Sequence, residues 1–146
     1  LETLQGLIEK FENTFSEFNI EKIKTVGDAI VAVSGLFSLD TSSVKNCVDC
    51  SLRLKDIANS FSMPWDLHIG IHFGSLVAGT VGKKTVQYDI LGQNVNMAFN
   101  ICDLSEPNQI LISSDAWMTV RNEINVKSIG LKRLKSGQEI EILECN

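Results

Sequence analysis

The sequence predicts a single domain of the α+β or α/β class, and three observations lead to this prediction. The 146 residues fit one domain, and an apolar fraction of 44% is enough for a hydrophobic core. Segments with apolar residues every three or four positions alternate with strand-like segments, without internal repeats. No linker divides the chain, so we expect residues 1–146 to fold as one unit.

The first half of the chain predicts two helices separated by a hairpin. The dipeptide Gly27-Asp28 favours a tight turn, because glycine tolerates positive φ and aspartate bonds to nearby backbone N–H groups. Thr41-Ser42-Ser43 can supply the N-cap of the second helix. The expected elements are a helix over residues 1–18, strands over 20–26 and 29–34, a loop over 36–41 and a helix over 43–60.

The second half predicts five strands and two helices. Pro64 and Pro107 separate elements, and Gly74, Gly79 and Gly82 punctuate a second hairpin-like region. The expected elements are a strand over residues 66–73, an apolar segment over 76–78, a strand over 88–91, a helix over 94–104, a strand over 110–112, a short helix over 113–123, and terminal strands over 126–135 and 140–143.

Composition excludes several classes of protein. A net charge of −5 argues against a general nucleic-acid surface, and no apolar run approaches the roughly 18 residues of a membrane span. The N-terminal segment does not have the pattern of a signal peptide. Cys47 and Cys50 form a CxxC without a second CxxC or a histidine pair, so we expect helix residues near a buried face rather than a zinc site. The cysteine pattern favours a reducing, cytoplasmic location.

Two segments are rich in residues that can bind a ligand or take part in catalysis. Glu21–Asp28 places a carboxylate at a strand turn and a lysine four residues before it. Gln87–Ala98 places Asp89 and Asn96 on either side of a glycine bend. Such a set can hold a metal ion, a purine edge and a phosphate.

Several motifs, in order along the chain, resemble those of one family, the class III nucleotidyl cyclases, and in particular its adenylyl type. The resemblance covers nearly the whole chain. It implies a ferredoxin-like palm with extra C-terminal strands, and active sites at a head-to-tail dimer interface. The implied reaction converts ATP into cyclic AMP and pyrophosphate. The motifs are Lys24-Thr25-Val26-Gly27-Asp28-Ala29, Ser34-Gly35-Leu36, Ile69-Gly70-Ile71-His72-Phe73-Gly74, Ala78-Gly79-Thr80-Val81-Gly82, and Tyr88-Asp89-Ile90-Leu91-Gly92 through Asn96.

The resemblance gives five residues a role. Asp28 matches the second metal-binding aspartate, a ligand of Mg²⁺ or Mn²⁺. Lys24 and Asp89 match the purine-reading pair, in which lysine donates to adenine N1 and aspartate accepts from the N6 amine. Guanine reverses this donor and acceptor pattern, so the pair favours ATP. Asn96 matches the transition-state asparagine near the ribose, and Lys135 resembles the lysine that binds the triphosphate.

Each of these residues also has a purely structural interpretation. Asp28 can be a turn residue, Asp89 a strand-end cap and Asn96 a residue that satisfies its own helix N-terminus. Lys24 can be a solvated strand lysine like Lys22, which simple alternation places on the same strand face. Lys135 can be a charged turn residue. His68 and His72, four residues apart, are expected on one face as packing or surface residues.

Two departures from the family pattern stand out. The family's first strand, with its first metal-binding aspartate and a Gly-Phe-Thr phosphate loop, precedes the helix that residues 1–18 match, and neither is present in the sequence. We therefore expect an N-terminally incomplete domain with a gap in its sheet. Asn100 stands where the family places an arginine that points at the phosphates. Loss of that cation is expected to slow the reaction about 100-fold or more.

Three interpretations follow. The first is an adenylyl cyclase catalytic domain, weak or inactive as this chain alone, which binds ATP and pairs with itself or another cyclase domain. The second is a catalytically inactive cyclase-like module that binds nucleotide or only dimerises. The third is a ferredoxin-like interaction domain with accidental motifs.

Overall fold

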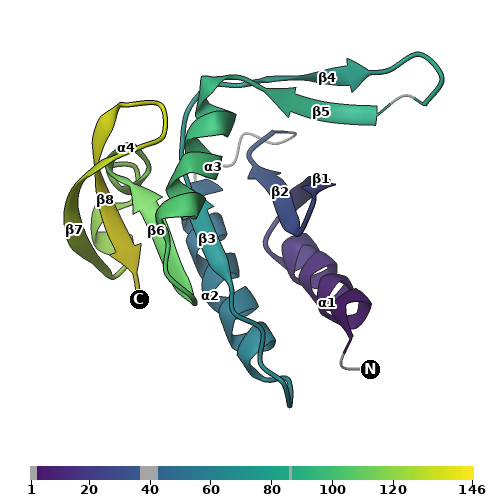
Figure 1. Cartoon of the computed structure of the whole chain (residues 1–146), viewed down its shortest axis with the longest axis horizontal. Helices are drawn as coiled ribbons and strands as arrows, with labels where there is room; N and C mark the ends of the chain where they lie inside the picture. The colour runs from purple at the N-terminus through teal and green to yellow at the C-terminus, as the bar shows by residue number, and fades with distance from the viewer. Residues whose placement is uncertain (1–2, 37–42, 86) are drawn as a thin grey trace.

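The computed structural model describes residues 3–36, 43–85 and 87–146 (Figure 1). The helices are α1 (Leu4–Glu17), α2 (Ser43–Asn59), α3 (Gln93–Leu104), α4 (Ser114–Trp117) and the 3-10 turn η1 (Arg121–Glu123). The strands are β1 (Ile20–Val26), β2 (Ala29–Ser34), β3 (His68–Ile71), β4 (Val77–Val81), β5 (Gln87–Leu91), β6 (Gln109–Ser113), β7 (Val126–Arg133) and β8 (Glu139–Cys145).

The strands form three sheets. β1 and β2 make an antiparallel hairpin, β4 and β5 make another, and a four-stranded sheet has the order β3-β6-β8-β7. β3 runs parallel to β6, and the other pairs of this sheet are antiparallel. Within the described residues β2 pairs only with β1 and β3 only with β6, while α2 contacts both β2 and β3. The β1–β2 hairpin and the four-stranded sheet are therefore separate in the described residues, and the expected missing strand between them stays a prediction.

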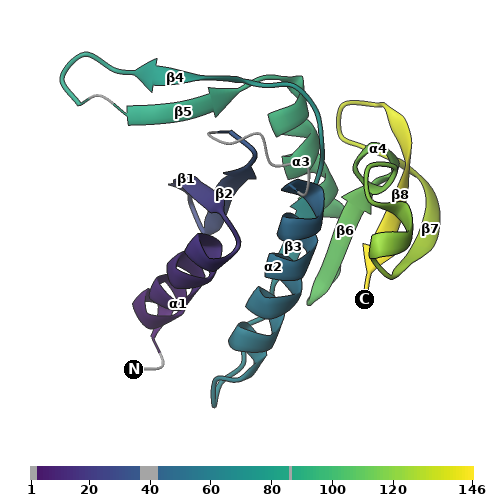
Figure 2. The ribbon, with the colours of Figure 1, turned by 180° about the vertical axis from the view of Figure 1, so that it is seen from behind.

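The four-stranded sheet is covered on both faces. Successive strand residues point to opposite faces. Accordingly, Ile110 and Ile112 of β6 pack with residues of α2 and α4, whereas Leu111 packs with Ile101 of α3. A third cluster joins α1, β1 and α2 through residues such as Phe11 and Ile20. In both views α2 and β3 lie between the unit of α1, β1 and β2 and the unit of β6, β7 and β8 (Figures 1 and 2).

The β4–β5 hairpin forms an arm that projects beyond the rest of the domain (Figures 1 and 2). Its strands pair in register from Val77 with Leu91 to Val81 with Gln87. Directly opposed residues share a face of such a pair. Val77, Val81 and Leu91, all exposed, therefore lie on the same face of the arm as Asp89. None of the helices in the described ranges has the length and apolar character that crossing a membrane requires.

The expected elements are present, with corrections at several ends. The first helix starts at Leu4, because the Thr3 side chain accepts a hydrogen bond from the Gly6 N–H at 3.1 Å and acts as N-cap. The strand expected over 66–73 is only His68–Ile71. The caps expected at Thr41 and Ser42, with most of the 36–41 loop, fall outside the described residues.

The helix expected over 113–123 was wrong. Only α4 and the short η1 are helical there. The Thr119 hydroxyl bonds back to the Ala116 carbonyl at 2.8 Å, and Arg121 has a φ of 34°, so the chain turns instead of continuing the helix. At the next element, β7 stops at Arg133 because the Leu134 N–H bonds to the Gln138 carbonyl and closes a turn.

Candidate nucleotide site

Lys24 of β1 and Asp89 of β5 form an ion pair between segments 65 residues apart. Lys24 Nζ lies 2.9 Å from Asp89 Oδ1 and 3.1 Å from Oδ2. The side chains are 32% and 19% exposed, so the pair is half-buried but open to an approaching ligand. The structure thus brings together the two residues that the sequence assigned to the purine.

The environment of Asp89 keeps its carboxyl ionised. The hydrogen bond from Lys24 and a second one from the Ile90 N–H, at 2.8 Å to Oδ1, lower the pKa of Asp89 below its usual value. Gly79 pairs directly opposite Asp89 on β4, and it has no side chain to cover the carboxylate. Asp89 is therefore an ionised acceptor beside the donor Lys24.

A β-bulge in β1 separates Lys24 from Lys22. Lys22 pairs with Ala32 and Lys24 with Val31, so Ile23 is an extra residue in the ladder. Because Ala32 and Val31 are neighbours and point to opposite faces, the two lysines do as well. Lys22 accordingly bonds to Glu12 of α1 at 2.9 Å, on the other side of the hairpin. The expectation that both lysines share a face was wrong, since simple alternation does not hold across a bulge.

Asp28 lies at the exposed β1–β2 turn, next to Gly27 with its φ of 61°. A Cβ at Gly27 would meet nothing within 4 Å, so the turn is open to a ligand. The described residues contain no group of three or more histidines, cysteines or carboxylates suited to a metal. Since Mg²⁺ is often held by one or two carboxylates together with substrate phosphates, Asp28 fits one position of such a site.

Asn96 is exposed in the first turn of α3, and its backbone N–H bonds to the Gly92 carbonyl at 3.3 Å. Asn100, at the position of the expected arginine, is half-buried one helical turn later. Lys135 follows β7 and pairs with Asp103, near the C-terminal end of α3, at 2.9 Å. The structure therefore places Asn96 and Lys135 against different ends of α3.

Comparison with known proteins identifies the family. The family model described as adenylate and guanylate cyclase catalytic domain matches residues 1–143. This chain belongs to that family. The cyclase domain is 29% identical over 148 residues to soluble guanylate cyclase gcy-31 of Caenorhabditis elegans, a match that covers 97% of the chain and 20% of that protein. It is 31% identical over 123 residues to the aggregation-specific adenylate cyclase of Dictyostelium discoideum, covering 77% of the chain and 9% of that protein.

Comparison with solved structures gives the same family of folds. The guanylate cyclase domain of RhGC from Catenaria anguillulae, solved in complex with GTP, superimposes with a TM-score of 0.93 at 18% identity, covering 99% of this chain and 81% of that one. The class III cyclase fold predicted from the motifs is confirmed. The relatives include both adenylate and guanylate cyclases. Membership in the family therefore does not determine whether the substrate is ATP or GTP.

His68 and His72 are structural residues, as the sequence predicts, but their partners were not predicted. His68 Nδ1 lies 2.9 Å from the Ser105 carbonyl oxygen, and His72 Nε2 lies 2.9 Å from Asn94 Oδ1. Both partners belong to the ends of α3. The spacing of four residues correctly indicated one shared face, but nothing in the sequence indicated which helix would cover it.

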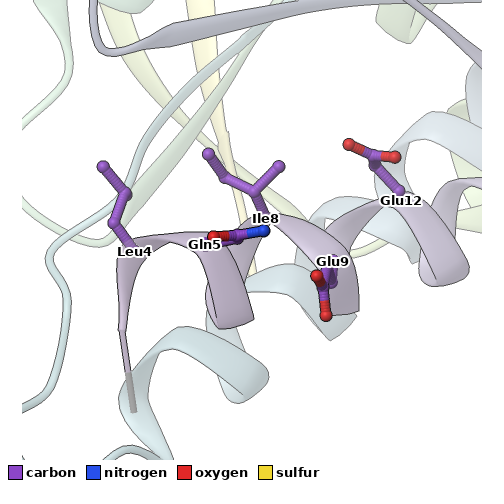
Figure 3. A pocket seen from close by; sticks show the side chains of 5 residues that line it. All are labelled: Leu4, Gln5, Ile8, Glu9 and Glu12. Carbon is purple, nitrogen blue, oxygen red and sulfur yellow. The ribbon is translucent and has the colours of Figure 1, made fainter. Parts of the chain in front are cut away.

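A shallow depression lies elsewhere, along the surface of α1. Leu4, Ile8 and Glu12, each one turn apart, project to the same side of the helix, with Gln5 and Glu9 completing the lining (Figure 3). None of these residues belongs to the pair of Lys24 and Asp89. The candidate nucleotide site therefore does not coincide with this depression. It is inferred from the chemistry of its side chains.

Proposed function

We propose that this cyclase domain is of the adenylyl type and takes part in converting ATP into cyclic AMP and pyrophosphate. The observation that carries the proposal is the ion pair of Lys24 and Asp89. The ammonium group donates to adenine N1, and the ionised carboxylate accepts from the N6 amine. Guanine presents an acceptor at O6 and a donor at N1, so each contact would be mismatched.

The reaction joins the ribose 3′-oxygen to the α-phosphorus and breaks the bond to pyrophosphate. Asn96 orients the ribose and the α-phosphate through its amide, from an exposed position on α3. Lys135 binds the triphosphate after it exchanges Asp103 for phosphate oxygens. This exchange costs little, because both side chains are largely exposed and such ion pairs are weak.

Asp28 supplies one carboxylate to bound Mg²⁺ or Mn²⁺. When bound, the divalent metal stabilises charge on the attacking and leaving oxygens. The family's other metal-binding aspartate has no counterpart in residues 1–146. We therefore expect little or no cyclic AMP production from this chain by itself, and activity only when a neighbouring segment or chain provides that carboxylate.

We further propose that the active form is a dimer, with a second copy or another cyclase domain on the arm. Val77, Val81 and Leu91 form an exposed apolar surface on the face of β4–β5 that also carries Asp89. A partner that covers this surface would border the nucleotide. This arrangement agrees with active sites that form between subunits.

A catalytically inactive, nucleotide-binding module is the second candidate. The half-buried Asn100 favours it, because an amide delivers no positive charge to the phosphates. In a protein that also supplies the missing metal-binding carboxylate, the replacement Asn100→Arg separates the two candidates. An adenylyl cyclase weakened at this position gains activity about 10-fold or more, whereas an inactive module gains none.

Nucleotide binding tests the proposed purine preference without requiring turnover. Affinities of the chain for ATP and GTP are measured by calorimetry in the presence of Mg²⁺. The proposal expects ATP to bind more tightly, and Asp28→Asn to weaken metal-dependent binding of either nucleotide. Equal affinities, or tighter binding of GTP, would contradict the assignment.

A further inference from the structure

Two histidines join β3 to opposite ends of α3. His68, at the start of β3, bonds to Ser105 at the C-cap of α3, and His72, just after β3, bonds to Asn94 in the first turn of that helix. Gly70 lies between them, where a Cβ would overlap the Cys102 backbone nitrogen. The face made of residues 68, 70 and 72 therefore lies against α3, with a polar contact at each end of the helix.

The hydrogen bonds around His72 define which of its ring nitrogens donates to Asn94. Asn94 Nδ2 donates to the Ser75 carbonyl at 2.7 Å, so Asn94 Oδ1 is the acceptor that faces His72 Nε2. Nε2 therefore carries a proton and donates to Asn94 Oδ1, while Nδ1 lies 2.7 Å from the Ser113 hydroxyl oxygen. The Ser113 oxygen in turn accepts from the Ala116 N–H at 3.3 Å.

The first turn of α3 has no side-chain cap at Gly92, so other contacts must hold it. Asn94 provides them. Besides its bonds to His72 and Ser75, its amide packs against Gly74, where a Cβ would overlap Asn94 Nδ2. The Asn94 side chain is therefore fixed from three directions.

The direction of Asn96 follows from that of Asn94. Two residues along a helix differ by about 200° around its axis, so the two side chains point to nearly opposite sides. Asn94 is bound to the sheet side, and Asn96 is exposed. A rotation of this turn that released Asn94 would also redirect Asn96.

We propose that His72 is a positioning residue. Its Nε2–H bond to Asn94 fixes the rotation of the first turn of α3 and thereby the direction of the Asn96 side chain. The role of Asn96 in catalysis rests on the proposed function, but the tether itself does not. The bond also reaches the base of the arm through Ser75, so His72 connects the β6–α4 junction, α3 and the segment that leads into β4.

Amide hydrogen exchange tests the tether directly. The Val95 and Asn96 amides, which bond to the Gly92 carbonyl, report on the first turn of α3. In His72→Phe we expect these amides to exchange about 10-fold faster, as the loss of one hydrogen bond allows. His72→Gln retains an N–H donor near Nε2 and should restore exchange to within about 2-fold of the original rate.

Two further variants complete the test. Asn94→Ala removes the acceptor while His72 stays in place, and it should accelerate the same amides as His72→Phe. His68→Phe is the matched control, because it removes a histidine contact at the other end of α3 and should leave Val95 and Asn96 unchanged. Unchanged exchange in His72→Phe, or equal acceleration across the sheet amides of β6 and β8, would overturn the positioning role.

Steady-state kinetics on an active protein that contains this domain separates the two proposals. Because Asn96 acts on the reacting groups, His72→Phe should lower kcat about 10-fold and leave KM for ATP within about 2-fold. Local acceleration of exchange, together with no cyclase activity in a protein that supplies the missing metal-binding carboxylate, would retain the tether and refute the proposed function. Cyclase activity with kcat unaffected by His72→Phe would refute the positioning of Asn96.

Discussion

Reversal of the purine-reading pair is expected to reverse the nucleotide preference. In Lys24→Glu with Asp89→Cys, a carboxylate at position 24 accepts from guanine N1–H, and the thiol at position 89 no longer matches the adenine amine. A hydrogen bond to a charged group contributes about 10-fold or more to affinity when it is fully desolvated. The Lys24 and Asp89 side chains are 32% and 19% exposed, so screening reduces this factor. Because both contacts change together, we still expect the ATP-to-GTP affinity ratio to fall by about 10-fold.

Competition of ATP and GTP for a fluorescent nucleotide analogue measures this ratio. Lys24→Glu alone places two carboxylates side by side and should weaken the binding of both ATP and GTP. The double variant should recover GTP binding. Lys22→Glu is the matched control: it makes the same charge change on the opposite face of β1, against Glu12, and should leave the ratio unchanged. A double variant whose ratio equals that of the original protein would refute the purine assignment.

Three further outcomes can be checked on this chain. Gly70→Ala should lower the free energy of unfolding by about 1–3 kcal/mol in urea titrations, because its Cβ would overlap the backbone of α3. Gly79→Ala, whose Cβ would meet nothing within 4 Å, should change this free energy far less. Equal losses in the two variants would contradict the packing described. Val77→Asp should weaken self-association in sedimentation analysis. Leu131→Asp is the control and should not, because Leu131 is equally exposed, at 70% against 68% for Val77, but lies on β7. Burial raises the pKa of the Cys50 thiol to about 12, so iodoacetamide at pH 8 should label it only after unfolding; fast labelling of the folded chain would count against that burial.

The periodic elements were predictable because local patterns determine them. The Gly27-Asp28 hairpin and the apolar spacing of α1 and α2 were each sufficient to define an element. The α4 region was not, because the hydroxyl of Thr119 and the positive φ of Arg121 depend on tertiary context. The end of a helix depends on which of several possible residues acts as its cap. For α1 that residue is Thr3.

The candidate site was predicted residue by residue but not in its contacts. Resemblance selected Lys24 and Asp89, and folding brings them within hydrogen-bond distance. The bulge that separates Lys24 from Lys22 has no sequence signal, since it arises from how β1 pairs with β2. The link from His72 to Asn94 joins residues 22 positions apart, and only the packing of α3 on β3 reveals it.

Lys24 and Asp89 are proposed to read an adenine edge in a reaction that yields cyclic AMP. The most direct measurement is the product formed from an equimolar mixture of ATP and GTP, with Mn²⁺, by a protein that contains this domain together with the complementary metal-binding aspartate. We expect cyclic AMP in large excess, and a reversed ratio in the Lys24→Glu, Asp89→Cys variant. Cyclic GMP as the main product of the original protein would contradict it.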